Sequence, residues 1–261
     1  MVKRNSRLGF HGGAHVFPGG AIDDQDRSVE LSELIPTFDS DEAARILGVE
    51  DSAAARGFFV GAARELFEEA GVLLATPAGG SGRGAIAGQT YDVQRKAVAD
   101  GSLSFAKFLI DHDFVLDLSG LVHFQHFITP VQEKKRFDTR FFLVRVADDE
   151  VAEHDRGETV DGEWILPAAA LARYRNKQMS LLPPTIHALE RLDACDSIDA
   201  ALEAAASAKV TAIMPRIIFE EGYVALLYPQ DPDYHSEQID RETAGRTVAR
   251  LVMIDGLWCR V

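Results

Sequence analysis

The segment from Ser52 to Gly71 limits the fold more than any other part of the chain, because it predicts a long helix with two unlike faces. Ser52 is a residue type that caps helix N-termini, and Gly71 is the type that ends helices. Beyond Gly71, residues 72–74 are apolar and predict a strand. Apolar residues recur at helical spacing: Phe59, Ala63, Leu66, Phe67 and Ala70. All of these except Leu66 lie on the face that we expect to pack into a core.

The other face of this helix carries three glutamates. Each residue rotates the helix by about 100°, so Glu69 lies about 40° to one side of Glu65 and Glu68 about 60° to the other. Three ionised carboxylates this close repel one another unless a cation lies among them. Mg²⁺ is the natural candidate, because it prefers oxygen ligands and keeps positions for substrate phosphates, and Mn²⁺ is the alternative. An acidic, solvated helix face without a metal is the other interpretation.

Two neighbouring features favour the metal. Arg64 lies one turn before Glu68 and is placed to orient its carboxylate by a bidentate pair. Upstream of the helix, residues 14–17 predict a short strand, which runs into the turn Phe17-Pro18-Gly19-Gly20.

These residues resemble the Nudix hydrolase family, whose signature is Gly-x5-Glu-x7-Arg-Glu-x-x-Glu-Glu-x-Gly. Residues 64–71 match its second half completely, and Gly20 matches its opening glycine. Forty-three residues separate Gly20 from Arg64, where the signature has thirteen, so thirty residues are inserted. Asp23, Asp24 and Asp26 are the candidates to replace the signature's first glutamate, whose role in the family is structural.

An insertion inside the signature resembles one branch of the family, the peroxisomal coenzyme A diphosphatases of animals. Three further segments share this resemblance, which spans roughly residues 1–193: residues 9–17, 136–142 and 182–185.

The resemblance implies a role for individual acidic residues. In the family, the box glutamates and the carbonyl of the loop glycine bind the metal, which here implies Glu65, Glu68, Glu69 and Gly20. Another acidic ligand often precedes a late strand that bears a tryptophan, and Glu158 fits that place; an exposed loop carboxylate is the other interpretation.

Catalytic and substrate-binding residues follow from the same resemblance. Glu65 or Glu68 is the candidate general base, with Arg64 beside them. The family's coenzyme A signature places basic residues before the turn, and Arg4 is in register with one of them, whereas Asn5 and Gly9 depart from it. Arg136 and Asp138 either line the substrate cleft or pair with each other at the start of a strand.

Two other patterns carry less weight. His123 and His126 are three residues apart on a predicted strand, so we expect their side chains on opposite faces and no shared metal. The glycine-rich segment 77–88 lacks the ending of a phosphate-binding P-loop and predicts a loop.

Charge and composition limit the partners. The formal net charge is −14, with 41 acidic and 27 basic residues among 261. This balance argues against nucleic acid as a partner, because phosphate backbones are held by clustered Lys and Arg. It permits a small nucleotide-like diphosphate substrate, which a carboxylate-bound metal would face.

The sequence also predicts a compartment. No stretch of apolar residues is long enough to span a membrane, and two cysteines indicate a reducing environment. Residues 1–7 do not lead into an apolar signal, and the chain does not end in a peroxisomal address. We therefore expect the cytoplasm.

Elsewhere, local patterns predict a mixture of helices and strands. The segment before Ser52 is acidic and predicts an irregular insertion with a weak helical stretch at 42–47. Helices are predicted at 91–100, 104–111, 184–192 and 198–208 and after Pro167, and strands at 122–129, 140–146, 163–166, 210–219, 223–228 and 247–254.

Together these features predict an α/β (α+β) fold, specifically a Nudix α/β/α sandwich with a mixed central sheet. We expect a Nudix domain over residues 1–193, with an insertion at about residues 24–51. Residues 194–261 are expected to form a helical and β extension that packs on this domain and offers a surface for a homodimer. The expected activity is Mg²⁺-dependent hydrolysis of a diphosphate linkage, and coenzyme A or an acyl derivative is the leading candidate substrate. ADP-ribose, a dinucleotide or a nucleoside triphosphate is the alternative, and so is a nucleotide-sensing module without catalysis.

Overall fold

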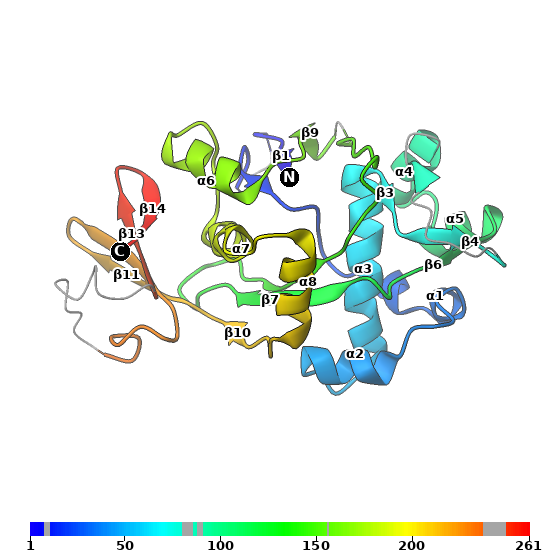
Figure 1. Ribbon diagram of the computed structural model, residues 1–261, viewed down its shortest axis with the longest axis horizontal. Coiled ribbons are helices and arrows are strands. Elements are labelled where there is room, and N and C mark those ends of the chain that lie inside the picture. The colour runs from blue at the N-terminus through cyan, green and yellow to red at the C-terminus, as the bar shows by residue number, and fades with distance from the viewer. Residues whose placement is uncertain (8–10, 80–85, 88–90, 156, 237–248) are drawn as a thin grey trace.

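The helix α3 (Ser52–Ala70) runs through the right-hand half of the molecule in Figure 1, and the C-terminal strands lie at the opposite side. Asp51, rather than the expected Ser52, caps α3, because its carboxylate accepts hydrogen bonds from the backbone of the first turn. Gly71 ends the helix as predicted, in the left-handed conformation with φ at 71°. The computed structural model describes residues 1–7, 11–79, 86–87, 91–155, 157–236 and 249–261.

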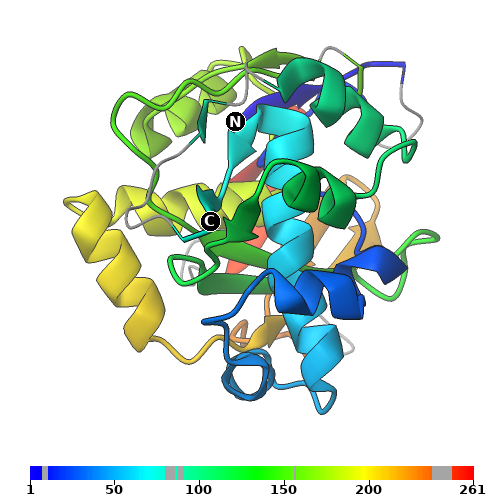
Figure 2. The same cartoon turned by 90° about the vertical axis from the view of Figure 1, so that its right-hand side faces the viewer.

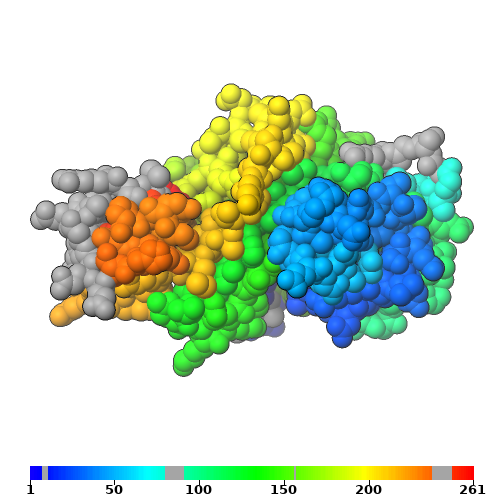
Figure 3. Space-filling model, turned by 90° about the horizontal axis from the view of Figure 1, so that it is seen from below, coloured from blue at the N-terminus to red at the C-terminus, as the bar shows by residue number. Residues whose placement is uncertain are grey.

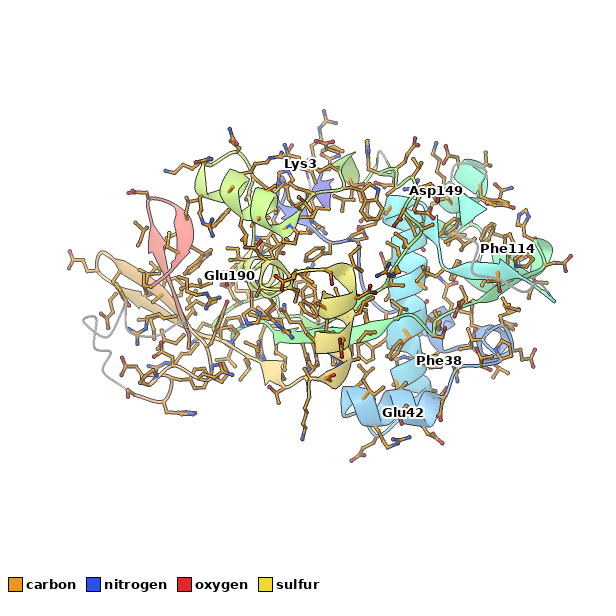
Figure 4. All side chains as sticks on the ribbon, in the orientation of Figure 1. Lys3, Phe38, Glu42, Phe114, Asp149 and Glu190 are labelled. Carbon is orange, nitrogen blue, oxygen red and sulfur yellow. The ribbon has the colours of Figure 1, made fainter. Side chains whose placement is uncertain are left out.

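One face of α3 lies in the main hydrophobic core. The four residues predicted to face the core are buried, as expected: Phe59, Ala63, Phe67 and Ala70. Phe67 stacks on Phe108 of α5 (Phe105–Asp111) with ring centroids 4.9 Å apart. Phe38 lies beside the lower half of α3 in Figure 4, and its ring centroid is 5.0 Å from that of Phe59. These rings fix the side of α3 that faces away from solvent.

The insertion contains the helix predicted at 42–47, but the prediction that the rest of it is irregular was wrong. It forms η1 (Asp24–Arg27), α1 (Val29–Glu33) and α2 (Ser40–Leu47), and Figure 2 shows α1 and α2 at the lower part of α3. Asp39 caps α2 at its N-terminus, and Gly48 ends it in the left-handed conformation. These helices form because each presents a few apolar residues to the core, although each is too short to show a strong helical period in the sequence.

Two three-stranded sheets flank α3. The first has the order β2-β1-β9 and is antiparallel: β2 (His15–Val16), β1 (Val2–Arg4) and β9 (Thr159–Gly162). The second is mixed, because β10 runs parallel to β7 and β8 antiparallel to it: β10 (Ala212–Ile213), β7 (Val122–Ile128) and β8 (Asp138–Leu143). Two short pairs, β3–β5 and β4–β6, lie at the C-terminal end of α3 and beyond: β3 (Val72–Leu73), β5 (Ile86–Ala87), β4 (Ala75–Pro77) and β6 (Phe114–Leu116).

The predicted strand at 163–166 was wrong, because the strand there is β9, at 159–162. Trp164 and Leu166 are exposed, and Leu166 instead precedes α6 (Pro167–Arg175). The remaining helices agree with prediction to within two residues: α4 (Asp92–Ala99), α5, α7 (Pro183–Asp193) and α8 (Ile198–Ser207).

A register shift in β7 overturns the prediction for its histidines. The pairing with β8 shifts between His123 and Gln125, so the alternation of side chains breaks at this bulge. His123 and His126 consequently lie on one face, with ring centroids 6.5 Å apart. The structure describes no metal-binding group that includes them.

The C-terminal residues form a four-stranded antiparallel sheet: β11 (Arg216–Glu220), β12 (Tyr223–Leu227), β13 (Arg250–Ile254) and β14 (Leu257–Arg260). Strand β14 was not predicted. Inside this sheet Arg250 is fully buried and pairs with Asp231 and Asp233. Seen from below, the insertion and the C-terminal sheet lie at opposite ends of the molecule, with β7–β8 and α8 between them (Figure 3).

Contacts join this sheet to the rest of the chain. Trp258 and the Tyr174 hydroxyl exchange two hydrogen bonds, of 2.6 and 3.2 Å. Arg260 pairs with Glu190 of α7. Among the described residues, no helix is long and apolar enough to cross a membrane.

Candidate active site

Arg64 joins the predicted site to the insertion. One edge of its guanidinium donates to Oε1 of Glu65 at 2.9 Å and to Oε1 of Glu68 at 3.1 Å. The other edge forms a bidentate pair with Asp26 at 2.8 and 3.0 Å. The expected bidentate pair with Glu68 was therefore wrong, because Asp26 takes the fork and Glu68 receives a single hydrogen bond.

Asp26 replaces the signature's first glutamate. Its side chain is fully buried, whereas Asp23 lies 3.9 Å from Arg64 and is 55% exposed, and Asp24 is exposed. Five residues lie between Gly20 and Asp26, as in the signature, so the inserted residues lie after Asp26. This spacing was the sequence signal that singles out Asp26 among the three candidates.

The Gly-Gly turn lies against the glutamate face of α3. The backbone N–H of Gly19 donates to Glu69 at 3.0 Å. A Cβ at Gly20 would lie 2.4 Å from the Glu65 carboxylate, so a side chain there would displace that carboxylate. The turn thus brings main-chain groups into contact with two of the three predicted metal ligands.

Arg4 and Glu158 come from the adjoining sheet. The backbone N–H of Asn5 donates to the Glu158 carbonyl at 2.8 Å, which aligns this end of β1 with the residues before β9. The charges of Glu158 and Arg4 act on the pKa of Glu69 in opposite directions: Glu158 raises it and Arg4 lowers it. The Arg4 Nε is buried and has no hydrogen-bond partner among the described residues.

All three glutamates have raised pKa values, because the neighbouring positive charge does not offset their desolvation. Desolvation, opposed by Arg64, raises the pKa of Glu65 to about 7. Desolvation, opposed by the Gly19 hydrogen bond, raises the pKa of Glu69 to about 8, and desolvation also raises the pKa of Glu68. A cation would favour the ionised form of all three.

The donor set fits a hard divalent cation. Within the described residues, no three acidic, His or Cys side chains already surround a common point as metal ligands. However, the described hydrogen bonds leave one oxygen of each glutamate without a protein donor: Oε2 of Glu65, Oε2 of Glu68 and Oε1 of Glu69. These oxygens and the Gly20 main chain are the ligand types that Mg²⁺ and Mn²⁺ prefer.

Arg136 and Asp138 lie elsewhere and do not pair with each other. Arg136 donates to the carbonyl of Thr129 at 3.1 Å. Asp138 is bonded to His126 at 2.5 Å and to Arg140 at 2.9 Å.

Arg140 links this second group to α3. Its guanidinium lies 4.0 Å from the ring centroid of Phe58, seven residues before Glu65 on the same side of the helix. The spacing places Phe58 about 10 Å along the helix from Glu65. Sequence reasoning missed Phe58 and Arg140, because neither belongs to the signature.

Comparison with known proteins identifies the family. The model of the NUDT19 Nudix domain matches residues 38–192. The chain belongs to the Nudix hydrolase family. Its fold class and its identity as a hydrolase are therefore as predicted, and Nudix hydrolases generally use divalent metal.

Relatives of this Nudix chain extend over most of its length. The acyl-coenzyme A diphosphatase NUDT19 of Gallus gallus is 27% identical over 91% of this chain and 74% of its own length. That of Homo sapiens is 27% identical over 74% of this chain and 59% of its own length. The crystal structure of a Nudix hydrolase from Alicyclobacillus acidocaldarius has a TM-score of 0.60 and 25% identity, and the match covers 77% of this chain and 86% of that one.

Proposed function

We propose that this Nudix hydrolase cleaves the diphosphate linkage of coenzyme A or its acyl thioesters, with Mg²⁺ as cofactor and Mn²⁺ as a substitute. The main observation that supports a hydrolytic site is the contact of the Gly19-Gly20 turn with the glutamates of α3. The substrate class is supported by the names of the relatives from Gallus gallus and Homo sapiens.

The proposed metal ligands are Glu65, Glu68, Glu69, the Gly20 carbonyl and Glu158. A bound metal would stabilise the negative charge that develops on the phosphoryl oxygens during hydrolysis. Arg64 holds one oxygen of Glu65 and one of Glu68 and so limits how these carboxylates turn.

Glu65 or Glu68 is the proposed base that accepts a proton from the attacking water. In each of these two carboxylates Arg64 bonds to Oε1, and Oε2 keeps lone pairs that could accept a proton. The hydrogen bonds therefore support this role without distinguishing Glu65 from Glu68.

The proposed substrate contacts lie on two sides of the glutamates. Arg4, with its unpartnered Nε, is placed for a phosphate near Glu69. On the other side we propose Asp138, together with Arg140, whereas Arg136 is held by Thr129 at the outer end of the sheet. Gly9, a departure from the coenzyme A signature, lies outside the described residues.

A hydrolysis screen tests the proposal. Coenzyme A, an acyl-coenzyme A, ADP-ribose, NADH and a dinucleoside polyphosphate are each incubated with the protein and Mg²⁺, and then with Mn²⁺. We expect the highest kcat/KM with coenzyme A or its thioester. A higher value with ADP-ribose or a dinucleotide would support the alternative substrate. Tight nucleotide binding without any product would support the sensing module. The cytoplasm as compartment and a homodimer as assembly stay predictions.

A further inference from the structure

Arg95 of α4 is buried against the C-terminal end of α3 and is only 5% exposed. Its Nε donates to the carbonyl of Glu68 at 2.8 Å, and its Nη2 donates to the carbonyl of Glu153 at 2.7 Å. The first of these carbonyls belongs to the last turn of a helix, where backbone acceptors lack helical partners and a cation is favoured. Arg95 therefore ties a site-bearing helix to a segment more than fifty residues further along the chain.

Gly71 makes this contact sterically available. A Cβ at this position would lie 3.1 Å from Nη1 of Arg95 and 3.7 Å from the Glu153 carbonyl. A third hydrogen bond, from the N–H of Glu153 to the carbonyl of Ala70 at 2.9 Å, closes the junction. The last glycine of the signature thus ends α3 and also leaves room for Arg95.

Asp155 fixes the turn that follows. Its carboxylate accepts hydrogen bonds from the N–H groups of Glu158 and Thr159, each at 2.8 Å, and from the Thr159 hydroxyl at 2.5 Å. From the other side, Asn5 donates its side-chain amide to the carbonyl of Gly157 at 3.2 Å. Thr159 itself is fully buried. The backbone around Glu158 is therefore held from two directions.

We propose that Arg95 and Asp155 are positioning residues that hold the Glu158 turn beside Glu69, so that both carboxylates serve one metal. Hydrogen bonds connect Glu68 through Arg95 to Glu153, the backbone continues from Glu153 to Asp155, and Asp155 bonds to Glu158. This inference rests on the proposed function, because it requires that Glu158 is a metal ligand.

Mn²⁺ binding to the full-length protein, measured by calorimetry, tests the inference without any substrate. Loss of outer contacts to a metal site weakens metal affinity about tenfold to a hundredfold, which is the loss expected for Arg95→Lys and Asp155→Asn. Glu158→Gln replaces a proposed ligand and should weaken Mn²⁺ affinity at least as much. In the double variant Arg95→Lys/Glu158→Gln the loss should not exceed that of Glu158→Gln alone, because Arg95 acts through Glu158. Arg173→Lys is the matched control, since Arg173 pairs with Glu163 beside β9 and should leave Mn²⁺ affinity unchanged.

Kinetics adds a readout that a purely structural role would not give. For Arg95→Lys we expect a higher Mg²⁺ requirement but an unchanged KM for coenzyme A at saturating Mg²⁺. Circular dichroism establishes that each variant is folded, and Asp155→Asn replaces Arg95→Lys if the latter does not fold.

Three results would overturn the inference. The first is unchanged Mn²⁺ affinity in folded Arg95→Lys and Asp155→Asn, and the second is a fully additive loss in the double variant. The third, unchanged affinity in Glu158→Gln, would remove the assigned role of Glu158 and the inference with it. Coenzyme A hydrolysis, measured separately, tells whether the proposed function still stands.

Discussion

At the scale of single residues, Arg64 has two roles: it bonds to proposed metal ligands and it anchors the helix. Its guanidinium, only 3% exposed, bonds to three carboxylates and to the carbonyl of Ala21. Such a buried cation persists because each edge has an anionic partner. The partners on one edge are proposed metal ligands, while the partner on the other edge anchors the helix.

Glu68→Gln tests the edge of Arg64 that faces the proposed metal ligands. An amide oxygen still accepts the hydrogen bond from Arg64, so the fold should persist, but the neutral side chain binds metal and accepts a proton poorly. We expect kcat to fall by roughly a hundredfold or more while the melting temperature changes little. The measurement is hydrolysis under saturating Mg²⁺, with Glu203→Gln on the distant helix α8 as the control. Wild-type turnover in Glu68→Gln would contradict the site.

Glu69→Gln tests the charge of the site through pH. Because burial raises the pKa of Glu65 to about 7 and of Glu69 to about 8, the folded metal-free protein binds these protons more tightly than the unfolded chain. Its free energy of unfolding should therefore fall as pH rises from the ordinary value of 4.5 toward 8, by up to about 1.4 kcal/mol for each unit by which a pKa is raised. Glu69→Gln keeps an acceptor for Gly19 and should flatten this slope. Urea unfolding in chelator at pH 5, 7 and 9 gives the answer, and equal slopes would refute the assignment.

Metal affinity should change with pH in the opposite sense. Metal binds the ionised carboxylates, so binding releases protons wherever the pKa lies above the working pH. We expect Mn²⁺ affinity to rise between pH 6 and pH 8 and to level off above it. Calorimetric titrations in two buffers of different ionisation enthalpy report the number of protons released. No proton release at pH 6.5 would contradict the raised pKa values.

At the scale of elements, the insertion and α3 are joined by the pair of Asp26 and Arg64. Gly61 leaves space for this contact, since a Cβ there would lie 3.1 Å from Asp26 Oδ2. Arg56 adds a hydrogen bond from α3 to the carbonyl of Arg27 at 2.9 Å. The short helix η1 thus takes its position from α3, rather than from its own sequence.

Asp26→Asn should therefore cost stability. Removing one charge from a buried pair leaves the other without full compensation, and the expected loss is about 3 kcal/mol in the free energy of unfolding. Denaturant unfolding measures this loss. Asp24→Asn, in the same helix but exposed, should change stability by less than about 0.5 kcal/mol. Similar values for the two variants would show that the buried pair does not anchor η1.

The predictability of these elements follows from their length and partners. Helix α3 was predictable because nineteen residues display a full apolar face, with Gly71 at the end. Part of the insertion was misread because a helix of five residues depends on packing against α3. His123 and His126 were assigned to opposite faces because a bulge depends on the partner strand. Arg95 carried no signal, since its role arises from a carbonyl distant in sequence.

At the scale of the whole molecule, the C-terminal sheet is attached through a few specific contacts. Strand β10 extends the β7–β8 sheet, and Tyr174 bonds to the backbone of Trp258. Side chains from both parts share clusters, including Leu257 and Trp258 beside Tyr174. These contacts lead to a prediction about cooperativity.

We expect residues 194–261 to unfold together with the Nudix domain. Trp164→Phe leaves Trp258 as the only tryptophan, so its fluorescence reports the C-terminal sheet, while circular dichroism reports mainly the helices before it. The two urea transitions should coincide. Tyr174→Phe removes two hydrogen bonds and should lower stability by about 1–2 kcal/mol, without separating the transitions. A fluorescence transition at clearly lower urea would show that the sheet is an independent unit.

The position of Asp26 has a consequence for how such proteins are recognised. The two halves of the signature are far apart in the chain, yet they meet in space through the ion pair of Asp26 and Arg64 and the contacts of the Gly-Gly turn. Lengthening a connection adds little entropic cost once its ends are held together. The distance between the halves is therefore almost free to vary among relatives. A search pattern with a fixed number of residues between the two halves of the signature would miss this protein. A pattern that allows any number of residues between them would find it.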